Sequence, residues 1–265
     1  MTRRTNVLAT VLCVALGTGA LPSAAWAQAP DLSPQTPGVS TPFSDTAPSL
    51  SRIVADSFRD LKHLPSVENA IILGIGGAGA GVGHAWDTRS SNMLSSSRDM
   101  GGVLSQGGSI GSMQAQAAAA FATYAIGRVT HHPKATAIGA DLIKAQIVTQ
   151  VMTQGVKFAV GRTRPDGTNL SFPSGHTASA FATATVVQRN LGWKFGVPAY
   201  AVAAYVGASR IQDKRHYLSD VAFGAALGIV AGRTVTVGSG DARFAVSPTV
   251  APGGGGVNFT WVGKH

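Results

Sequence analysis

The chain has 265 residues, of which 45% are hydrophobic and only 12% are charged, and its formal net charge at pH 7 is +9. A basic chain so poor in charge lacks the dense Lys/Arg stripes of a nucleic-acid-binding protein, and its aromatic residues (7%) are too few for a platform that stacks single-stranded bases. The single cysteine, Cys13, excludes a disulfide framework and a cysteine-based zinc site. We therefore expect no nucleic-acid partner.

The first 27 residues have the pattern of a secretory signal peptide. Arg3 and Arg4 precede a short apolar run, and Ala25-Trp26-Ala27 provides the small-x-small pattern of a cleavage site. The apolar run is too short for a membrane anchor. We therefore expect export, with the mature protein periplasmic or associated with the cell envelope. Residues 28–49, rich in proline and serine, are expected to form an extended linker.

Helical periodicity predicts an all-α domain over residues 50–237. Apolar residues recur at helical spacing in residues 50–64, and Pro65-Ser66 is expected to end that helix and to cap the next. The Ser-, Gly- and Asn-rich residues 87–111 predict a loop. Further helices are expected at about 67–85, 112–128, 136–160, 176–190, 197–209 and 218–232.

The glycines between residues 74 and 83 superficially resemble a nucleotide-binding loop. A dinucleotide fold needs a preceding strand and a βαβ unit, and no such alternation follows. Small residues at these positions instead predict close packing between helices.

The predicted helices are interrupted by charged residues and glutamines, more often than spans of about 20 apolar residues allow. This favours a soluble Ala/Gly-rich bundle over a polytopic membrane protein, and leaves short spans or peripheral membrane association open. In residues 238–265, apolar residues alternate with others on both sides of a glycine run, which predicts a short C-terminal β-hairpin.

Three short motifs contain residues suited to phosphate chemistry. Two arginines and a lysine can neutralise oxyanion oxygens, and a Ser-Gly pair opening a helix offers free backbone N–H groups. Two histidines and an aspartate can supply an acid, a nucleophile and an orienting group. His216 and Asp220 are four residues apart, so one helical turn would place them on one face. The motifs are K-x6-RP (Lys157, Arg164, Pro165), PSGH (Pro173, Ser174, Gly175, His176) and SR-x5-H-x3-D (Ser209, Arg210, His216, Asp220).

In this order and spacing, the motifs resemble the signature of the type 2 phosphatidic acid phosphatase (PAP2) superfamily. That superfamily includes secreted bacterial class A acid phosphatases, membrane lipid phosphatases and vanadium haloperoxidases. The resemblance implies a helical bundle with a metal-independent site and no cofactor. It implies that His216 is the nucleophile that forms a phosphohistidine, that Asp220 orients it, and that His176 protonates the leaving alcohol. The phosphate oxygens would be held by Lys157, Arg164, Ser174, Gly175 and Arg210.

The expected activity is therefore the hydrolysis of phosphomonoesters. The expected substrate is a phosphorylated small molecule or a lipid phosphate. One alternative is a vanadium-dependent, haloperoxidase-like oxidoreductase that uses the same residues to bind vanadate. Another is a non-catalytic envelope module that captures an anion. The sequence leaves the natural substrate and the oligomeric state open.

Several charged residues near the motifs are expected to be structurally neutral. His131 and His132 are expected in a solvated loop, and His84 at a helix end. Loop charges are expected at Arg162, Asp166, Asp213, Lys214 and Arg215, with contact between Asp166 or Lys214 and the substrate as the alternative.

Overall fold

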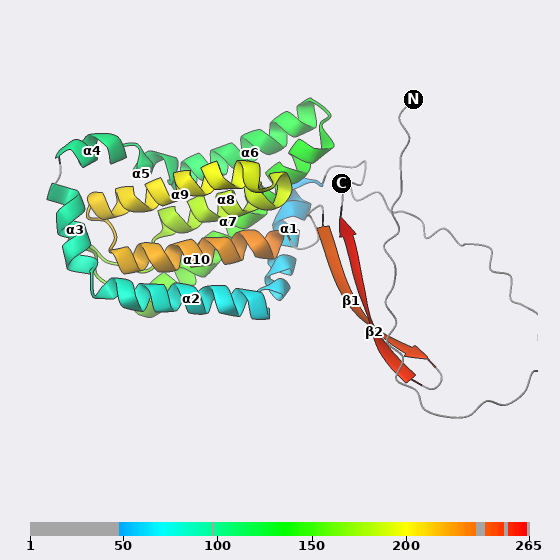
Figure 1. Ribbon diagram of the computed structural model, residues 1–265. Coiled ribbons are helices and arrows are strands. Elements are labelled where there is room, and N and C mark those ends of the chain that lie inside the picture. Colours follow the sequence, from blue (N-terminus) through cyan, green and yellow to red (C-terminus); the bar gives the residue numbers. More distant parts are fainter. Residues whose placement is uncertain (1–47, 97, 237–241, 252–253, 264–265) are drawn as a thin grey trace, which may run out of the picture. The chain divides into compact units, whose positions relative to one another are not determined.

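The computed structural model describes residues 48–96, 98–236, 242–251 and 254–263 (Figure 1). The expected signal peptide and all of the expected linker before residue 48 lie outside the described residues. The body is helical, as predicted. Its elements are α1 (Leu50–Asp60), the 3-10 helix η1 (Leu61–His63), α2 (Val67–His84), α3 (Asp87–Ser96), α4 (Arg98–Leu104), α5 (Gly107–Ile110), α6 (Met113–Val129), α7 (Pro133–Val160), α8 (Gly175–Leu191), α9 (Trp193–Gln212) and α10 (Leu218–Val235).

Local capping explains where most helices begin and end. His132 caps α7, because its Nδ1 accepts a hydrogen bond of 3.3 Å from the Ala135 amide. At the other end of α7, Gly161 adopts a left-handed conformation (φ 63°) that terminates the helix. Serine side chains accept from the backbone at the start of four other helices: Ser49 for α1, Ser66 for α2, Ser112 for α6 and Ser174 for α8.

The prediction of a loop over residues 87–111 was wrong, because this segment contains α3, α4 and α5. Asp87 and Ser91 are buried, and all three helices pack against α9. Serine, glycine and asparagine have weak helix propensity in isolation, but tertiary packing supplies most of the stability of a helix in a protein.

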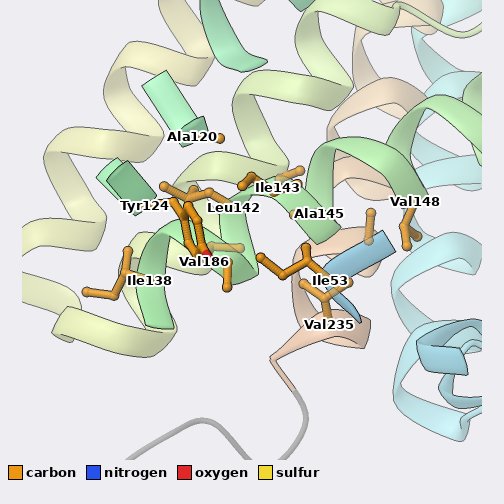
Figure 2. Close-up of a cluster of buried hydrophobic side chains, with 13 residues drawn as sticks. Ile53, Ala120, Tyr124, Ile138, Leu142, Ile143, Ala145, Val148, Val186 and Val235 are labelled. Carbon is orange, nitrogen blue, oxygen red and sulfur yellow. The ribbon is translucent and has the colours of Figure 1, made fainter. Parts of the chain in front are cut away.

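The main hydrophobic core forms around α7. Side chains from α1, α6, α8 and α10 converge on it, among them Ile53, Tyr124, Val186 and Val235 (Figure 2). Val148 of α7 is only 1% exposed. The core therefore joins segments far apart in the sequence and holds α7 and α8, which carry two of the three motifs.

α8 and α10 are in unusually close contact. A Cβ at Gly228 would overlap the carbonyl oxygen of Ala178, and one at Gly224 would lie 2.7 Å from the carbonyl oxygen of Ser174. Glycine at these positions lets the two backbones approach, since it has no side chain to separate them. The start of α8 is thereby held beside the start of α10.

The prediction that glycines of α2 permit close packing holds at some positions. A Cβ at Gly76 would overlap Ala226 of α10, and Gly83 lies against Ser219. Four other glycines of α2 have no other atom near the position of a Cβ: Gly74, Gly77, Gly79 and Gly81.

Two strands follow the helices in sequence. β1 (Ala242–Ala251) and β2 (Gly254–Gly263) pair antiparallel, with Phe244 opposite Trp261 and Val246 opposite Phe259.

Among the described helices, α10 alone is long and apolar enough to cross a membrane by length and composition. It is 61% buried inside the bundle, and the core helix of a soluble protein meets the same criterion.

Candidate active site

The three motifs lie together at the C-terminal ends of α7 and α9 and the N-terminal ends of α8 and α10. Lys157 lies in the last turn of α7 and Arg164 in the loop after it. Arg210 lies in the last turn of α9. The side chains of Lys157, Arg164, Arg210 and His216 are all close enough to His176, in the first turn of α8, to lower the pKa of its imidazole. Folding therefore brings every predicted motif into one site.

His216 and Asp220 are neighbours, but not for the predicted reason. His216 precedes α10, whose N-cap is Tyr217, so the two side chains do not share a helical face. Asp220 folds back to accept a hydrogen bond of 2.8 Å from the Tyr217 amide. This capping geometry places Asp220 Oδ2 3.6 Å from His216 Nδ1. Within the described part of the chain, that nitrogen has no hydrogen-bond partner.

His216 is nearly enclosed, with 3% of its surface exposed. Burial lowers the pKa of its imidazole, Asp220 opposes that effect, and Lys157 and Arg164 lower the pKa further. The net direction is downward, so the ring is neutral at pH 7. A neutral imidazole whose Nδ1 faces a carboxylate has Nε2 available as a nucleophile.

His176 experiences a strongly positive environment. Burial is the largest cause of its lowered pKa, and Arg210, His216, Arg164 and Lys157 add to it, so that the pKa falls to about 4. An anion bound among these cations would favour the protonated ring and raise the pKa again.

The three predicted phosphate-binding cations differ in their surroundings. Lys157 is 7% exposed and donates from Nζ to the carbonyl oxygen of Leu170 at 2.6 Å. Burial, followed by Arg164, lowers the pKa of Lys157 to about 8, although Asp220 opposes the shift. Arg210 pairs with Asp213, which lies in the turn after α9, as expected for a loop charge.

Ser174 and Gly175 form the first turn of α8, as predicted. The Ser174 hydroxyl accepts from the Thr177 amide at 3.4 Å and from the Thr177 hydroxyl at 2.9 Å. A Cβ at Gly175 would lie 4.0 Å from Cε of Lys157. The free backbone N–H groups at this helix start therefore lie beside the lysine.

Sequence reasoning missed the side chains that surround Asp220. Arg162, expected to be a loop charge, donates from Nη1 to Asp220 Oδ1 at 2.8 Å and from Nη2 to Asp87 Oδ2 at 2.7 Å. Ser171 donates its hydroxyl to Asp220 Oδ2. Burial raises the pKa of Asp220, but the nearby His216 ring, hydrogen bonds from Ser171 and the Tyr217 amide, and Arg162 hold it below its ordinary value. The only signal in the sequence was the proximity of Arg162 and Ser171 to motif residues.

The remaining loop charges behave largely as expected. Asp166 and Arg215 form an ion pair of 3.0 Å, and the Arg215 side chain is 47% exposed. His84 ends α2, as expected, and its Nδ1 lies 3.1 Å from Asp87 Oδ2. His132 is exposed and serves as the cap of α7 described above.

α5, which was not predicted, lies directly over part of the site. A Cβ at Gly108 would overlap the guanidinium of Arg210, and one at Gly111 would lie 3.3 Å from Cβ of His176. The segment before α6 therefore sets the position of Arg210.

No cluster of three or more His, Cys, Asp or Glu side chains suited to a metal ion occurs among the described residues.

Part of the chain matches a known family and two known proteins. Residues 134–243 match the PAP2 superfamily. The chain is 48% identical over 85 residues to a lipid A 1-phosphatase of Porphyromonas gingivalis, and 30% identical over 96 residues to a lipid A 4′-phosphatase of Helicobacter pylori. These alignments cover 31% and 32% of this chain and 19% and 48% of the respective relatives, so the chain spans less than half the length of each.

Two solved structures resemble the model. One is Aquifex aeolicus LpxE (22% identity, TM-score 0.48), for which the match covers 56% of this chain and 93% of that chain. The other is a transmembrane PAP2-type phosphatidylglycerolphosphate phosphatase of Bacillus subtilis (17% identity, TM-score 0.43), with coverage of 69% and 92%. None of these matches supports the expected C-terminal β-hairpin.

Proposed function

We propose that the chain is a member of the PAP2 superfamily, whose family model matches residues 134–243, and that it is a metal-independent phosphatase that hydrolyses lipid phosphates through a phosphohistidine on His216. The observation that carries this proposal is the convergence of a neutral, buried His216, its Asp220 neighbour and three cations around His176. Fixed positive charge and positioning are the main requirements of phosphoryl transfer.

In the first step, Nε2 of His216 attacks the phosphorus and the bond from phosphorus to the ester oxygen breaks. His176, protonated in the complex, donates its proton to the departing alcohol oxygen. Asp220 accepts from Nδ1 and stabilises the positive charge that develops on the His216 ring.

In the second step, neutral His176 takes a proton from water, and the resulting hydroxide attacks the phosphohistidine. The bond from phosphorus to Nε2 breaks and inorganic phosphate leaves. Throughout both steps, Lys157, Arg164 and Arg210 neutralise the phosphoryl oxygens, and the Ser174 hydroxyl and the Gly175 N–H group donate to them.

Two features favour a lipid phosphate over a soluble ester. The aligned relatives are a lipid A 1-phosphatase and a lipid A 4′-phosphatase. The described bundle also exposes many large apolar side chains, which would suit association with a lipid surface. On three helices they are Val67, Ile71, Ile75 and Val82 (α2), Phe121, Ile126 and Val129 (α6), and Trp193, Phe195 and Val197 (α9).

We also propose that residues 1–27 direct export and that residues 28–49 link the signal to the PAP2 domain. The basic start, short apolar run and Ala25-Trp26-Ala27 pattern support this. Amino-terminal sequencing of the mature protein from the cell envelope tests the proposal, and retention of Met1 would contradict it.

The test of function compares turnover of lipid A, lysophosphatidate and p-nitrophenyl phosphate in detergent micelles by the wild type and His216→Ala. We expect lipid phosphates to be preferred, His216→Ala to be inactive, EDTA to leave activity intact, and an alkali-stable phosphoenzyme to form only with His216. Absence of turnover with phosphate still bound would favour the anion-binding module. Vanadate-dependent bromination, in place of inhibition by vanadate, would favour the oxidoreductase.

A further inference from the structure

Arg162 joins two carboxylates that are distant in the sequence. Its Nη1 contacts Asp220, and its Nη2 contacts Asp87 in the first turn of α3. The side chains of Asp87 and Asp220 are 5% and 0% exposed, whereas that of Arg162 is 21% exposed. A buried carboxylate is costly unless it is paired and hydrogen-bonded, so each of these aspartates depends on the arginine.

Asp87 also accepts hydrogen bonds at the start of α10. Its Oδ1 accepts from the Ser219 amide at 2.9 Å, and its Oδ2 accepts from the Ser219 hydroxyl at 2.7 Å. A carboxylate at a helix N-terminus satisfies free N–H groups and is favoured by the helix dipole. Asp87 therefore fixes both Arg162 and the turn of α10 that carries Asp220.

Both terminal nitrogens of the Arg162 guanidinium contact protein groups. Nη1 also donates to the Ser219 hydroxyl at 2.6 Å, and Nη2 lies 3.4 Å from His84 Nδ1. One face of the group covers the Tyr217 ring, with Cζ 4.2 Å from the ring centroid. Arg162 is thus engaged by protein groups on its edge and on its face.

The two carboxylate oxygens of Asp220 have different partners. Arg162 occupies Oδ1, while Oδ2 accepts from Ser171 and the Tyr217 amide and lies nearest to His216 Nδ1. If the Asp220 carboxylate rotated, its Oδ2 atom would no longer face Nδ1 of His216. Outer hydrogen bonds of this kind orient catalytic groups in the same way that they orient metal ligands.

We propose that Arg162 and Asp87 are positioning residues that hold Asp220 against His216, and that Arg162 does not bind the phosphate. The proposal rests on the proposed phosphatase function of the same site. It predicts a loss in kcat with little change in KM, because the interaction orients the nucleophile and does not contact the substrate.

The experiment measures kcat, KM and thermal unfolding for Arg162→Gln, Arg162→Lys and Asp87→Asn. We expect kcat to fall by about 10- to 100-fold with KM within about twofold of wild type. Arg162→Lys is not expected to restore kcat, because one ammonium group cannot reproduce the contacts of the guanidinium with both Asp87 and Asp220. The double variant Arg162→Gln/Asp87→Asn should be no slower than Arg162→Gln alone, since the two residues act as a unit.

Arg59→Gln is the matched control. It removes an Arg–Asp contact of the same length, 2.7 Å, to Asp56 on the exposed side of α1. Its kcat should equal that of the wild type.

The outcomes separate this proposal from the proposed function. An inactive wild type, or a fully active His216→Ala, would refute the phosphatase proposal itself. With an active wild type and an inactive His216→Ala, an unchanged kcat in folded Arg162→Lys and Asp87→Asn would overturn the positioning role. A rise in KM of tenfold or more at constant kcat would also overturn it, by making Arg162 a phosphate ligand. If Arg162→Gln does not fold, kcat and KM of Arg162→Lys and Asp87→Asn test the positioning role.

Discussion

The Nδ1 atom of His216 lies 3.6 Å from Oδ2 of Asp220 because Asp220 caps the helix that begins just after His216. The backbone turn that starts α10 thus also defines the orientation of the candidate nucleophile. Asp220 is fully buried and accepts hydrogen bonds from Arg162, Ser171 and the Tyr217 amide. Catalytic alignment and helix capping depend here on one carboxylate.

Asp220→Asn should abolish most turnover while preserving the cap. An asparagine can still accept from the Tyr217 amide, but it cannot stabilise a positively charged His216 ring. We expect kcat to fall by about 10³- to 10⁴-fold, as measured with the preferred substrate of the wild type. A circular dichroism spectrum and a melting temperature close to wild type would show that the fold remains intact. Retention of even a tenth of the activity would contradict the role of Asp220.

His176 should titrate at different pH values with and without a bound anion. Burial and the charges of Arg210, His216, Arg164 and Lys157 hold its pKa at about 4, so the ring is neutral above that pH. Inorganic phosphate should raise this pKa, because the anion stabilises the protonated imidazole. NMR titration of the His176 ring, assigned with His176→Gln, measures both values.

The rise in the pKa of His176 on anion binding should also appear in the pH dependence of kcat and kcat/KM. The basic limb of kcat, which reports the substrate complex, should lie at higher pH than the basic limb of kcat/KM, which reports the free enzyme. Coincident limbs, together with an unshifted NMR pKa in phosphate, would argue against His176 as the acid.

Substrate affinity should weaken as pH rises through about 8. Burial, with Arg164, lowers the pKa of Lys157 to about 8, and lysine is charged only below its pKa. Above pH 8 the site therefore loses one positive charge, and KM should rise between pH 7 and 9.5. Lys157→Arg keeps its charge over this range and should remove that dependence, whatever its absolute activity. A wild-type KM that stays flat to pH 9.5 would count against the assignment.

Gly108→Ala should impair the site without unfolding the protein. A methyl group at Gly108 would overlap the guanidinium of Arg210, which can move because it ends a flexible side chain. Displacing a substrate-binding group by about 1 Å can cost up to about 10²-fold, so we expect kcat/KM to fall by at least about tenfold. Gly102→Ala is the control, since no other atom lies near a Cβ there. Equal kinetics for the two variants would show that α5 does not set the position of Arg210.

Gly228→Ala should destabilise the fold. The added methyl group would overlap the Ala178 carbonyl oxygen and force α8 away from α10. Overpacking of this kind costs about 1–3 kcal/mol of unfolding free energy. Gly155→Ala on α7 has open space and should be neutral or stabilising by about 1 kcal/mol. Urea denaturation of both variants tests the difference, and equal stabilities would contradict the close-packing argument.

Much of the helical bundle was predictable because its signals are local. The apolar period of residues 50–64 and the cap at Ser66 place helices within a few residues of their observed ends. The segment 87–111 was not predictable in this way. Its helices depend on burial of Asp87 and Ser91 and on packing against α9, which no local pattern encodes.

The sequence by itself determined the three motifs, the match of residues 134–243 to the PAP2 superfamily and the identity of the candidate site residues, because spacing within a motif is a property of the chain. Tertiary structure alone decided that Arg162 and Asp87, 75 residues apart in the chain, share the environment of Asp220. It also decided that Asp220 meets His216 through a helix cap. These relationships arise from burial: removed from water, each charged group must find its partner among side chains that folding brings near.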